Sequence, residues 1–209
     1  MSPRKAAALR DSQTLPAHLV AAAERLIASQ GAAGLTVRAI AREARVADGV
    51  LYNHFADKEE LLALALHAHV RSVERGLPAL PAEAGSGAVE DNLRAYVAYG
   101  MALHVAILPA FAGLLAQPKV LSRFAELADP VAHGPGLRAA LAAYLRAEQA
   151  LGRLSAAADP DAAATMIVGA CHELVLPHLL HGTPAAEIAF PPGFAGQLVT
   201  ICLRGIAPP

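Results

Sequence analysis

The chain has 209 residues, of which 55% are hydrophobic and only 4% aromatic, and its 17 Lys and Arg nearly balance its 18 Asp and Glu. A formal net charge of -1 excludes an architectural protein that binds DNA without sequence preference, because such proteins carry a large excess of basic side chains. Much of the hydrophobic content is Ala, the strongest helix former, while β-branched and aromatic residues are sparse, so the composition predicts an all-α protein.

The N-terminal segment, residues 1–15, is expected to be a flexible arm. Its basic residues are not followed by an uninterrupted apolar run, so no signal peptide is predicted. Residues 1–58 carry eight basic and five acidic side chains, whereas the rest of the chain has a net charge of -4. This asymmetry is expected where only the first part of a chain meets phosphate.

A helix-turn-helix domain is predicted over residues 16–58. Apolar residues recur at helical spacing over 16–30, and again over 37–44 behind Thr36, a suitable N-cap. A third helical pattern covers 46–55, and the capping-box pair Asp57 and Glu60 begins a longer helix. Two short helices joined by a tight turn are the layout that places a recognition helix in the major groove.

The outward face of the third helix is predicted to read DNA if Leu51 and Phe55 face the core. Asn53 has the paired donor and acceptor that match an adenine edge, and Val50 offers methyl groups to a thymine methyl. Lys58 lies where its charge reaches a phosphate, beside the free amides of the next helix. The residues predicted to contact DNA are Arg38, Asp48, Gly49, Val50, Tyr52, Asn53, His54 and Lys58.

The stretch LTVRAIAREARVADGVLYNHFADKEELL, with the helix before it, resembles the DNA-binding domain of TetR/AcrR-family transcriptional regulators. The resemblance covers roughly residues 16–70, about a quarter of the chain. It implies that the helix ending in Tyr52 and Phe55 enters the major groove. It also implies that Tyr52 and Lys58 bind phosphate.

Three residues depart from the pattern of that family. Arg45 stands where Gly is usual in the turn, and must adopt the turn without the freedom of glycine at positive φ. Ala47 stands where Ser or Thr usually caps the recognition helix, a loss of about 1 kcal/mol unless Asp48 supplies the cap. Asp48 replaces a common lysine, so we expect weaker phosphate attraction and acceptance of a cytosine amine.

Residues 59–209 are predicted to form a second, all-helical domain. Helices are expected over residues 89–108, 110–117, 119–127, 135–151, 162–180 and 193–203. Residues 95–118 carry no formal charge over a length that could cross a membrane. Small residues dominate this stretch, and His104 and Pro109 interrupt it, which favours a buried helix pair in a soluble core, with no membrane partner.

The resemblance implies that the second domain binds a small molecule, and both the residues and the resemblance indicate that it dimerises. Its last two helices are apolar almost all round, and a four-helix bundle with a second copy would cover them, as the resemblance also implies. Two recognition helices held about 34 Å apart would read a palindromic operator. The candidates for lining a ligand pocket, each with ordinary core as the alternative, are Tyr96, Tyr99, His104, Phe111, Phe124, Met166 and His172.

Other functions have less support in the sequence. His178 and His181 are three residues apart, but Pro177 is expected to break their helix, and no metal site or cofactor is predicted. The two cysteines, Cys171 and Cys202, are expected to be buried free thiols, which suits the cytoplasm. No nucleophile, phosphate-loop or zinc-protease motif is present, so no enzyme is predicted. The expected function is a ligand-released repressor, with a metal-responsive regulator or a helical-body enzyme as the alternative.

Overall fold

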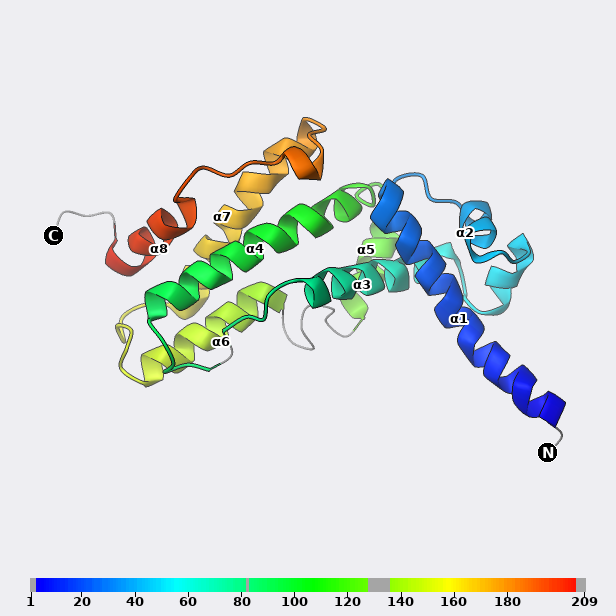
Figure 1. Cartoon of the computed structure of the whole chain (residues 1–209), viewed down its shortest axis with the longest axis horizontal. Coiled ribbons are helices and arrows are strands. Elements are labelled where there is room, and N and C mark those ends of the chain that lie inside the picture. Colours follow the sequence, from blue (N-terminus) through cyan, green and yellow to red (C-terminus); the bar gives the residue numbers. More distant parts are fainter. Residues whose placement is uncertain (1–2, 82, 128–135, 206–209) are drawn as a thin grey trace. The chain divides into compact units, whose positions relative to one another are not determined.

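The computed structural model of the protein describes residues 3–81, 83–127 and 136–205, and the regular structure in these ranges is helical throughout (Figure 1). This agrees with the predicted all-α class. The elements in chain order are α1 (Pro3–Gln30), α2 (Val37–Ala44), the 3₁₀ helix η1 (Asp48–Asn53), α3 (Lys58–Gly76), α4 (Val89–Ala112), α5 (Pro118–Glu126), α6 (Gly136–Ala150), α7 (Pro160–Leu180), the 3₁₀ helix η2 (Ala185–Glu187) and α8 (Phe194–Arg204).

The chain divides into two compact units. Unit 1 comprises Met1–Ser72 and Pro109–Pro130, and unit 2 comprises Val73–Leu108 and Val131–Pro209. The sequence predicted a single division after residue 58. In the structure, α5 and the end of α4 belong to the same compact unit as the helix-turn-helix.

The core of unit 1 joins the three predicted N-terminal helices to the start of α3. Its fully or almost fully buried side chains come from every one of these elements and include Leu19, Leu26, Ile40, Leu51, Phe55, Leu61, Leu62 and Leu66. The predicted apolar stripe of the first helix is therefore confirmed as a core face. One expectation was wrong: α1 begins at Pro3, so residues 3–15 are helical rather than an irregular arm. This segment is rich in Ala, Leu, Arg and Lys, which favour helix, and proline is well tolerated in a first turn.

The turn between α2 and η1 forms as the sequence requires. The hydroxyl of Thr36 accepts a hydrogen bond from the Ala39 amide at 3.1 Å, which confirms the predicted N-cap. At the other end, Arg45 has φ 57° and ψ 42°, and it is the one non-glycine residue at positive φ among the residues that the structure describes. Its amide donates to the carbonyl of Arg42 at 3.1 Å, which closes the helix. Arg45 thus adopts the left-handed turn at a cost that glycine would not incur.

The end of α4 and helix α5 complete the core of unit 1. Ala110, Leu114 and Val120 are buried in this core. Phe111 and Phe124 pack edge to face with ring centroids 5.2 Å apart. The predicted separate helix over 110–117 was wrong, because α4 continues through Pro109 as far as Ala112. A proline removes only its own amide from the helical ladder, and packing on both sides compensates for that loss.

Close approach at Gly113 shows how tightly this segment fits against the first two helices. A Cβ atom added at Gly113 would lie 2.6 Å from the backbone nitrogen of Ala33, in the loop between α1 and α2. Real Cβ atoms do not approach so closely, so only glycine allows this contact. The segment after α4 is therefore an integral part of unit 1.

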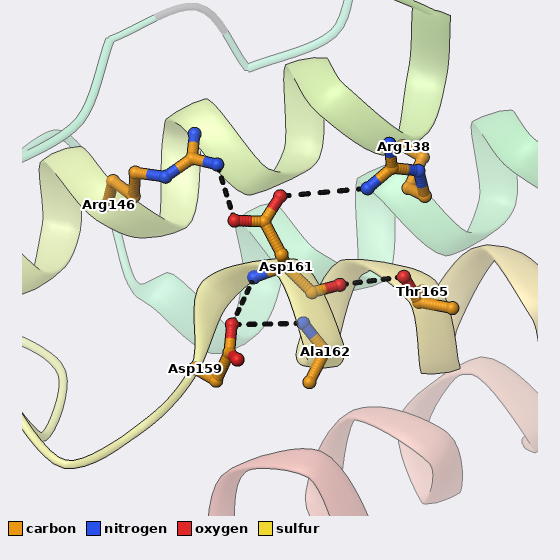
Figure 2. Close-up of polar contacts among 6 residues, drawn as sticks. All are labelled: Arg138, Arg146, Asp159, Asp161, Ala162 and Thr165. Carbon is orange, nitrogen blue, oxygen red and sulfur yellow. Dashed lines mark hydrogen bonds and ion pairs between the residues drawn. The ribbon is translucent and has the colours of Figure 1, made fainter.

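Unit 2 is built around α4, α6 and α7. At Gly100 on α4 an added Cβ would lie 3.1 Å from Sγ of Cys171 on α7 and 3.2 Å from Cδ2 of Leu137 on α6. Figure 2 shows a second link, in which Asp161 at the start of α7 pairs with Arg146 at 2.6 Å and with Arg138 at 3.6 Å, both on α6. Close packing thus joins the three helices inside, and ion pairs join α6 to α7 at the surface.

The first turn of α7 is held by Asp159. Its Oδ1 accepts hydrogen bonds from the amides of Asp161 at 2.9 Å and Ala162 at 3.2 Å (Figure 2). The predicted helix start is confirmed, two residues earlier than expected. The expected break at Pro177 was wrong, because α7 continues to Leu180.

Two helices, α4 and α7, are long and apolar enough to cross a membrane by length and composition alone. Core helices of water-soluble proteins meet the same test. In α4, 44% of the most apolar window is buried inside the protein, compared with 28% in α7. Much of α7 therefore lies uncovered within this chain.

Candidate nucleic-acid interface

The outer surface of η1 carries the side chains that the sequence assigned to DNA. Leu51 and Phe55 are 3% and 7% exposed, which confirms that they face the core. Tyr52, next to Leu51, is 62% exposed, and Asn53 is also exposed. Gly49 is exposed with nothing within 4 Å of an added Cβ, so this face is open to solvent. The buried pair therefore fixes which side chains point outward.

Three of the predicted contact residues, Val50, His54 and Lys58, are less accessible than expected. All three are half-buried. The amide of His54 donates to the carbonyl of Leu51 at 3.0 Å, so His54 forms the C-terminal cap of η1. His54 follows buried Leu51 by three residues, and residues three apart share a face in 3₁₀ geometry, so His54 is turned partly toward the core.

The start of η1 has no side-chain cap. Ala47 occupies the capping position without a hydrogen bond, and Asp48 does not replace it. Instead Oδ2 of Asp48 pairs with Nε of Arg38 on α2 at 3.2 Å, and both side chains are well exposed. Arg38 and Asp48, both predicted to meet DNA, thus lie together at the junction of the two helices of the motif.

The start of α3 lies after η1 and presents Lys58 as its first residue. Asp57 accepts a hydrogen bond from the Glu60 amide at 2.9 Å, and Glu60 accepts one from the Ala56 amide at 2.6 Å. The predicted capping box is confirmed, except that its return bond goes to Ala56 rather than to Asp57. Lys58 is half-buried, and it stands at the positive end of the α3 dipole.

One exposed apolar stripe runs along α7. Met166, Leu176 and Leu180 are 57%, 44% and 76% exposed, and their spacing with exposed Gly169 and Glu173 places them on one side of the helix. On α8, Ile201 and Leu203 are 44% and 37% exposed. Met166, predicted to line a ligand pocket, thus lies on this open stripe.

The two histidines predicted to meet a ligand lie against each other in unit 2, where His104 is buried and His172 is exposed. The rings of His104 on α4 and His172 on α7 have centroids 4.0 Å apart. Nδ1 of His104 lies 2.6 Å from the carbonyl oxygen of Gly100, so this nitrogen carries the proton that makes the hydrogen bond. Burial, and then the neighbouring His172, lower the pKa of His104 to about 4, so it is neutral at pH 7. Burial also lowers the pKa of His172.

The other predicted pocket residues do not gather around these histidines. Tyr96 packs against Tyr144 with centroids 5.3 Å apart and donates to the Pro81 carbonyl at 3.2 Å. Phe111 and Phe124 lie in unit 1. Tyr99 is buried, and its pKa is raised by burial and then by Glu74. The aromatic residues therefore serve several separate places in the core.

A small cavity lies between α4, α6, α7 and α8. Its volume is about 60 Å³, and its lining includes Leu93, Leu145, Ile167 and Cys202 but none of the predicted pocket residues. Ligand pockets usually have about 300 Å³ or more. A drug-sized molecule could enter here only if the helices moved apart.

A buried polar cluster around Glu148 was not predicted from the sequence. This side chain is fully buried on α6, where Oε1 accepts from the Gly85 amide at 3.1 Å and Oε2 lies 3.2 Å from Nη1 of Arg153. Burial and the neighbouring Glu148 raise the pKa of Tyr144 to about 12, and Asn92 donates to its hydroxyl at 2.9 Å. Glu148 continues the helical spacing of Leu141 and Tyr144. A carboxylate at a core position of this helix is the sequence feature that could have predicted the cluster. The cluster ties the 83–87 loop to α6.

Metal-binding side chains do not cluster within the described ranges. Within these ranges, no group of three or more His, Cys, Asp or Glu side chains is placed to hold a metal ion, and this includes His178 and His181. Nδ1 of His181 instead lies 2.6 Å from the Pro177 carbonyl. Cys171 and Cys202 are free thiols, and burial raises the pKa of Cys171 to about 11.

Comparison with known proteins supports the interpretation of unit 1. The family described as bacterial regulatory proteins, tetR family, matches residues 19–65. The HTH-type transcriptional regulator HbdR of Aromatoleum sp. (strain CIB) is 37% identical over 60 residues, which are 29% of this chain and 26% of that protein. The match thus spans about a quarter of the length of HbdR.

Solved structures resemble the chain over nearly its whole length. FadR of Bacillus subtilis, solved in complex with stearoyl-CoA, is 18% identical with a TM-score of 0.58, covering 91% of this chain and 98% of that one. The TetR family transcription regulator SCO0332 is 23% identical with a TM-score of 0.57, covering 93% and 100%. Residues 19–65 thus match the tetR family of bacterial regulatory proteins, and the chain as a whole has the all-helical fold of SCO0332.

Proposed function

We propose that this chain is a transcriptional regulator that binds a palindromic DNA operator as a homodimer and is released by a small molecule. The observation that carries the proposal is the exposed face of η1, where Tyr52, Asn53 and Gly49 stand over buried Leu51 and Phe55. A polar face on a rigid apolar support is what major-groove reading requires. In this proposal Asn53 reads an adenine edge, and Tyr52 and Lys58 hold phosphates.

The exposed stripe on α7 and the apolar residues of α8 support a homodimer. Contiguous exposed apolar side chains mark an interaction surface, and a second copy offers the same stripe related by a two-fold axis. A dimer also supplies the second recognition helix, without which one short helix has little affinity. The proposed location is the cytoplasm, where the DNA and a reducing environment suited to free thiols are found.

The effector is proposed to be a small apolar or amphipathic molecule. Unit 2 offers a mostly apolar interior in which buried His104 is neutral at pH 7, with the ring of His172 beside it. The FadR structure of the same fold holds stearoyl-CoA, an amphipathic ligand. Because the cavity in unit 2 is small, binding would have to select a more open arrangement of its helices.

Release follows if the ligand prefers an arrangement in which the recognition helices no longer fit successive grooves. To lower DNA affinity a hundredfold, the ligand must favour that arrangement by about 2.7 kcal/mol. A few buried contacts supply this difference. The ligand-free dimer would then repress the genes beside its operator.

The test is selection of sheared genomic DNA from the source organism by the purified protein, at two salt concentrations. We expect fragments that share a palindrome and are retained at the higher salt, because base contacts add to the salt-sensitive phosphate contacts. Uniform retention that disappears with salt would reject sequence-specific regulation. Fatty acyl-CoAs of increasing chain length, added to the retained complex, then test release.

A further inference from the structure

The strongest polar link within unit 1 joins α5 to the residue before Lys58. Both terminal nitrogens of Arg123 on α5 reach the carboxylate of Asp57: Nη1 pairs with Oδ1, and Nη2 lies 2.7 Å from Oδ2. This two-point geometry fixes the plane of the carboxylate as well as its distance. Both residues belong to unit 1, but Arg123 is far outside the matched residues 19–65.

The position of Arg123 is held by the core. On α5, Val120 is fully buried, and Phe124 packs edge to face on Phe111 at 5.2 Å. Arg123 itself remains 37% exposed, so the pair lies at the surface of the unit. The helix that carries the guanidinium is thus rigidly seated, while the charge stays near solvent.

Asp57 places a negative charge next to the proposed phosphate site. Its carboxylate caps α3 through the Glu60 amide at 2.9 Å. That hydrogen bond, and then the Arg123 guanidinium, hold the pKa of Asp57 below its usual range, so the group is ionised at pH 7. Glu59 and Glu60 follow Lys58, so the first turn of α3 would be strongly acidic without a counter-charge.

We propose that Arg123 is a positioning residue for DNA binding, which orients the Asp57 carboxylate as the α3 cap and balances its charge, so that a phosphate can approach Lys58. This inference rests on the proposed function and adds a residue to it that lies outside the helix-turn-helix. The uncompensated Asp57 charge should reduce affinity for any duplex about threefold at each half-site, and about tenfold for a dimer. Sequence preference should not change, because no base contact is altered.

A double-variant experiment separates this role from a structural one. Affinity for the selected palindrome is measured by fluorescence anisotropy for the wild type and for Arg123→Ala, Asp57→Asn and the double variant. Asparagine is also a good N-cap, so Asp57→Asn removes the charge and keeps the cap. We expect Arg123→Ala to bind about tenfold more weakly, and the double variant to regain most of the wild-type affinity because its local charge is again balanced.

Three results would overturn the inference. If the double variant binds as weakly as Arg123→Ala and the salt slope falls by about one per half-site, Arg123 contacts phosphate directly. If Arg123→Ala binds normally, the ion pair has no part in DNA binding. If thermal unfolding shows that Arg123→Ala and the double variant do not fold, Arg123→Lys is used instead, because it keeps the charge without the two-point geometry. A folded Arg123→Lys protein that retains less than half of the wild-type affinity would also reject the proposal.

Two controls identify the source of any failure. Arg146→Ala removes an arginine from an exposed ion pair with Asp161 in unit 2, and it should bind DNA as the wild type does. If Arg146→Ala loses as much DNA affinity as Arg123→Ala does, the effect at Arg123 comes from the change in net charge, and the inference is overturned. Lys58→Ala tests the phosphate site itself: if the wild type binds the palindrome and this variant binds equally well, only the inference fails. A wild type that selects no palindrome would reject the proposed function as well.

Discussion

The backbone amide of Phe55 donates to the carbonyl oxygen of Leu51 at 3.0 Å, and both side chains are buried. This short link closes η1 against the core formed by α1, α2 and α3. It fixes the direction of Tyr52 and Asn53, which lie between the two buried residues in the chain. The proposed reading face therefore depends on a packing contact behind it.

Replacing Phe55 by Ala should destabilise unit 1 by about 3–5 kcal/mol, because it leaves a cavity in a closely packed core. Chemical unfolding followed by far-ultraviolet circular dichroism measures the change. Tyr52→Ala is the matched control, since this aromatic side chain is 62% exposed, and we expect a loss below about 1 kcal/mol. Equal losses for the two variants would mean that the assignment of faces is wrong.

At Arg45, in the turn after α2, a substitution is expected to stabilise the protein. A non-glycine residue in the left-handed region costs about 1 kcal/mol or more, so Arg45→Gly should stabilise the folded state by roughly that amount, less the added entropy of the unfolded glycine. Arg45→Ala is the control, because it removes the same side chain and keeps the strained backbone. If Arg45→Gly is no more stable than Arg45→Ala, strain at this turn is negligible.

Much of unit 1 could be predicted because its signals are local. Thr36 as a cap, the Asp57 capping box and the burial of Leu51 and Phe55 each follow from spacing along one helix. The Arg123 contact could not be predicted in this way, because its partner is 66 residues away and meets it only through the fold. The same holds for Gly113 against Ala33.

The errors in the second unit also have physical causes. Pro109 was expected to end a helix and Pro177 to break one, but α4 and α7 continue through these residues, each without one backbone hydrogen bond. The predicted pocket residues were chosen because they are aromatic, His or Met side chains in helices, and this does not predict where they lie. Phe111 and Tyr96, for example, lie in different units. Two pairs were brought together, Phe111 with Phe124 in the core of unit 1 and His104 with His172 in unit 2.

The buried His104 should make the stability of unit 2 depend on pH. Its pKa falls from 6.5 in the unfolded chain to about 4 in the folded one, so the unfolded state binds more protons between these values. Stability is complete above pH 6.5 and is lost as the pH falls toward 4, by up to about 3 kcal/mol. Urea unfolding at pH 7.5, 5.5 and 4.5 measures the loss, which should be smaller in His104→Leu.

His181→Leu is the control for that experiment. His181 has the same contact to a carbonyl four residues earlier, at 2.6 Å, but its ring is exposed. We expect the wild-type pH profile from this variant. If His104→Leu also keeps the wild-type profile, buried His104 does not govern acid stability.

The exposed stripe on α7 should mediate dimerisation. Leu180→Glu places a charge on an exposed apolar face, and we expect it to shift the protein from dimer to monomer and to weaken operator binding at least about tenfold. Sedimentation velocity measures the oligomeric state. Leu115→Glu is the matched control, because Leu115 is 70% exposed in unit 1 and should leave the dimer intact. A Leu180→Glu protein that remains dimeric would exclude this stripe as the interface.

The central claim is that the outer face of η1 reads DNA sequence, and selection from a random duplex library tests it most directly. Wild type and Asn53→Ala are selected in parallel, and the enriched sequences are compared position by position. We predict a palindrome with half-site centres about 34 Å apart for the wild type, and for Asn53→Ala the same palindrome with one degenerate base pair in each half-site. An unenriched library with the wild type, or identical sequence preferences from the two proteins, would contradict the claim.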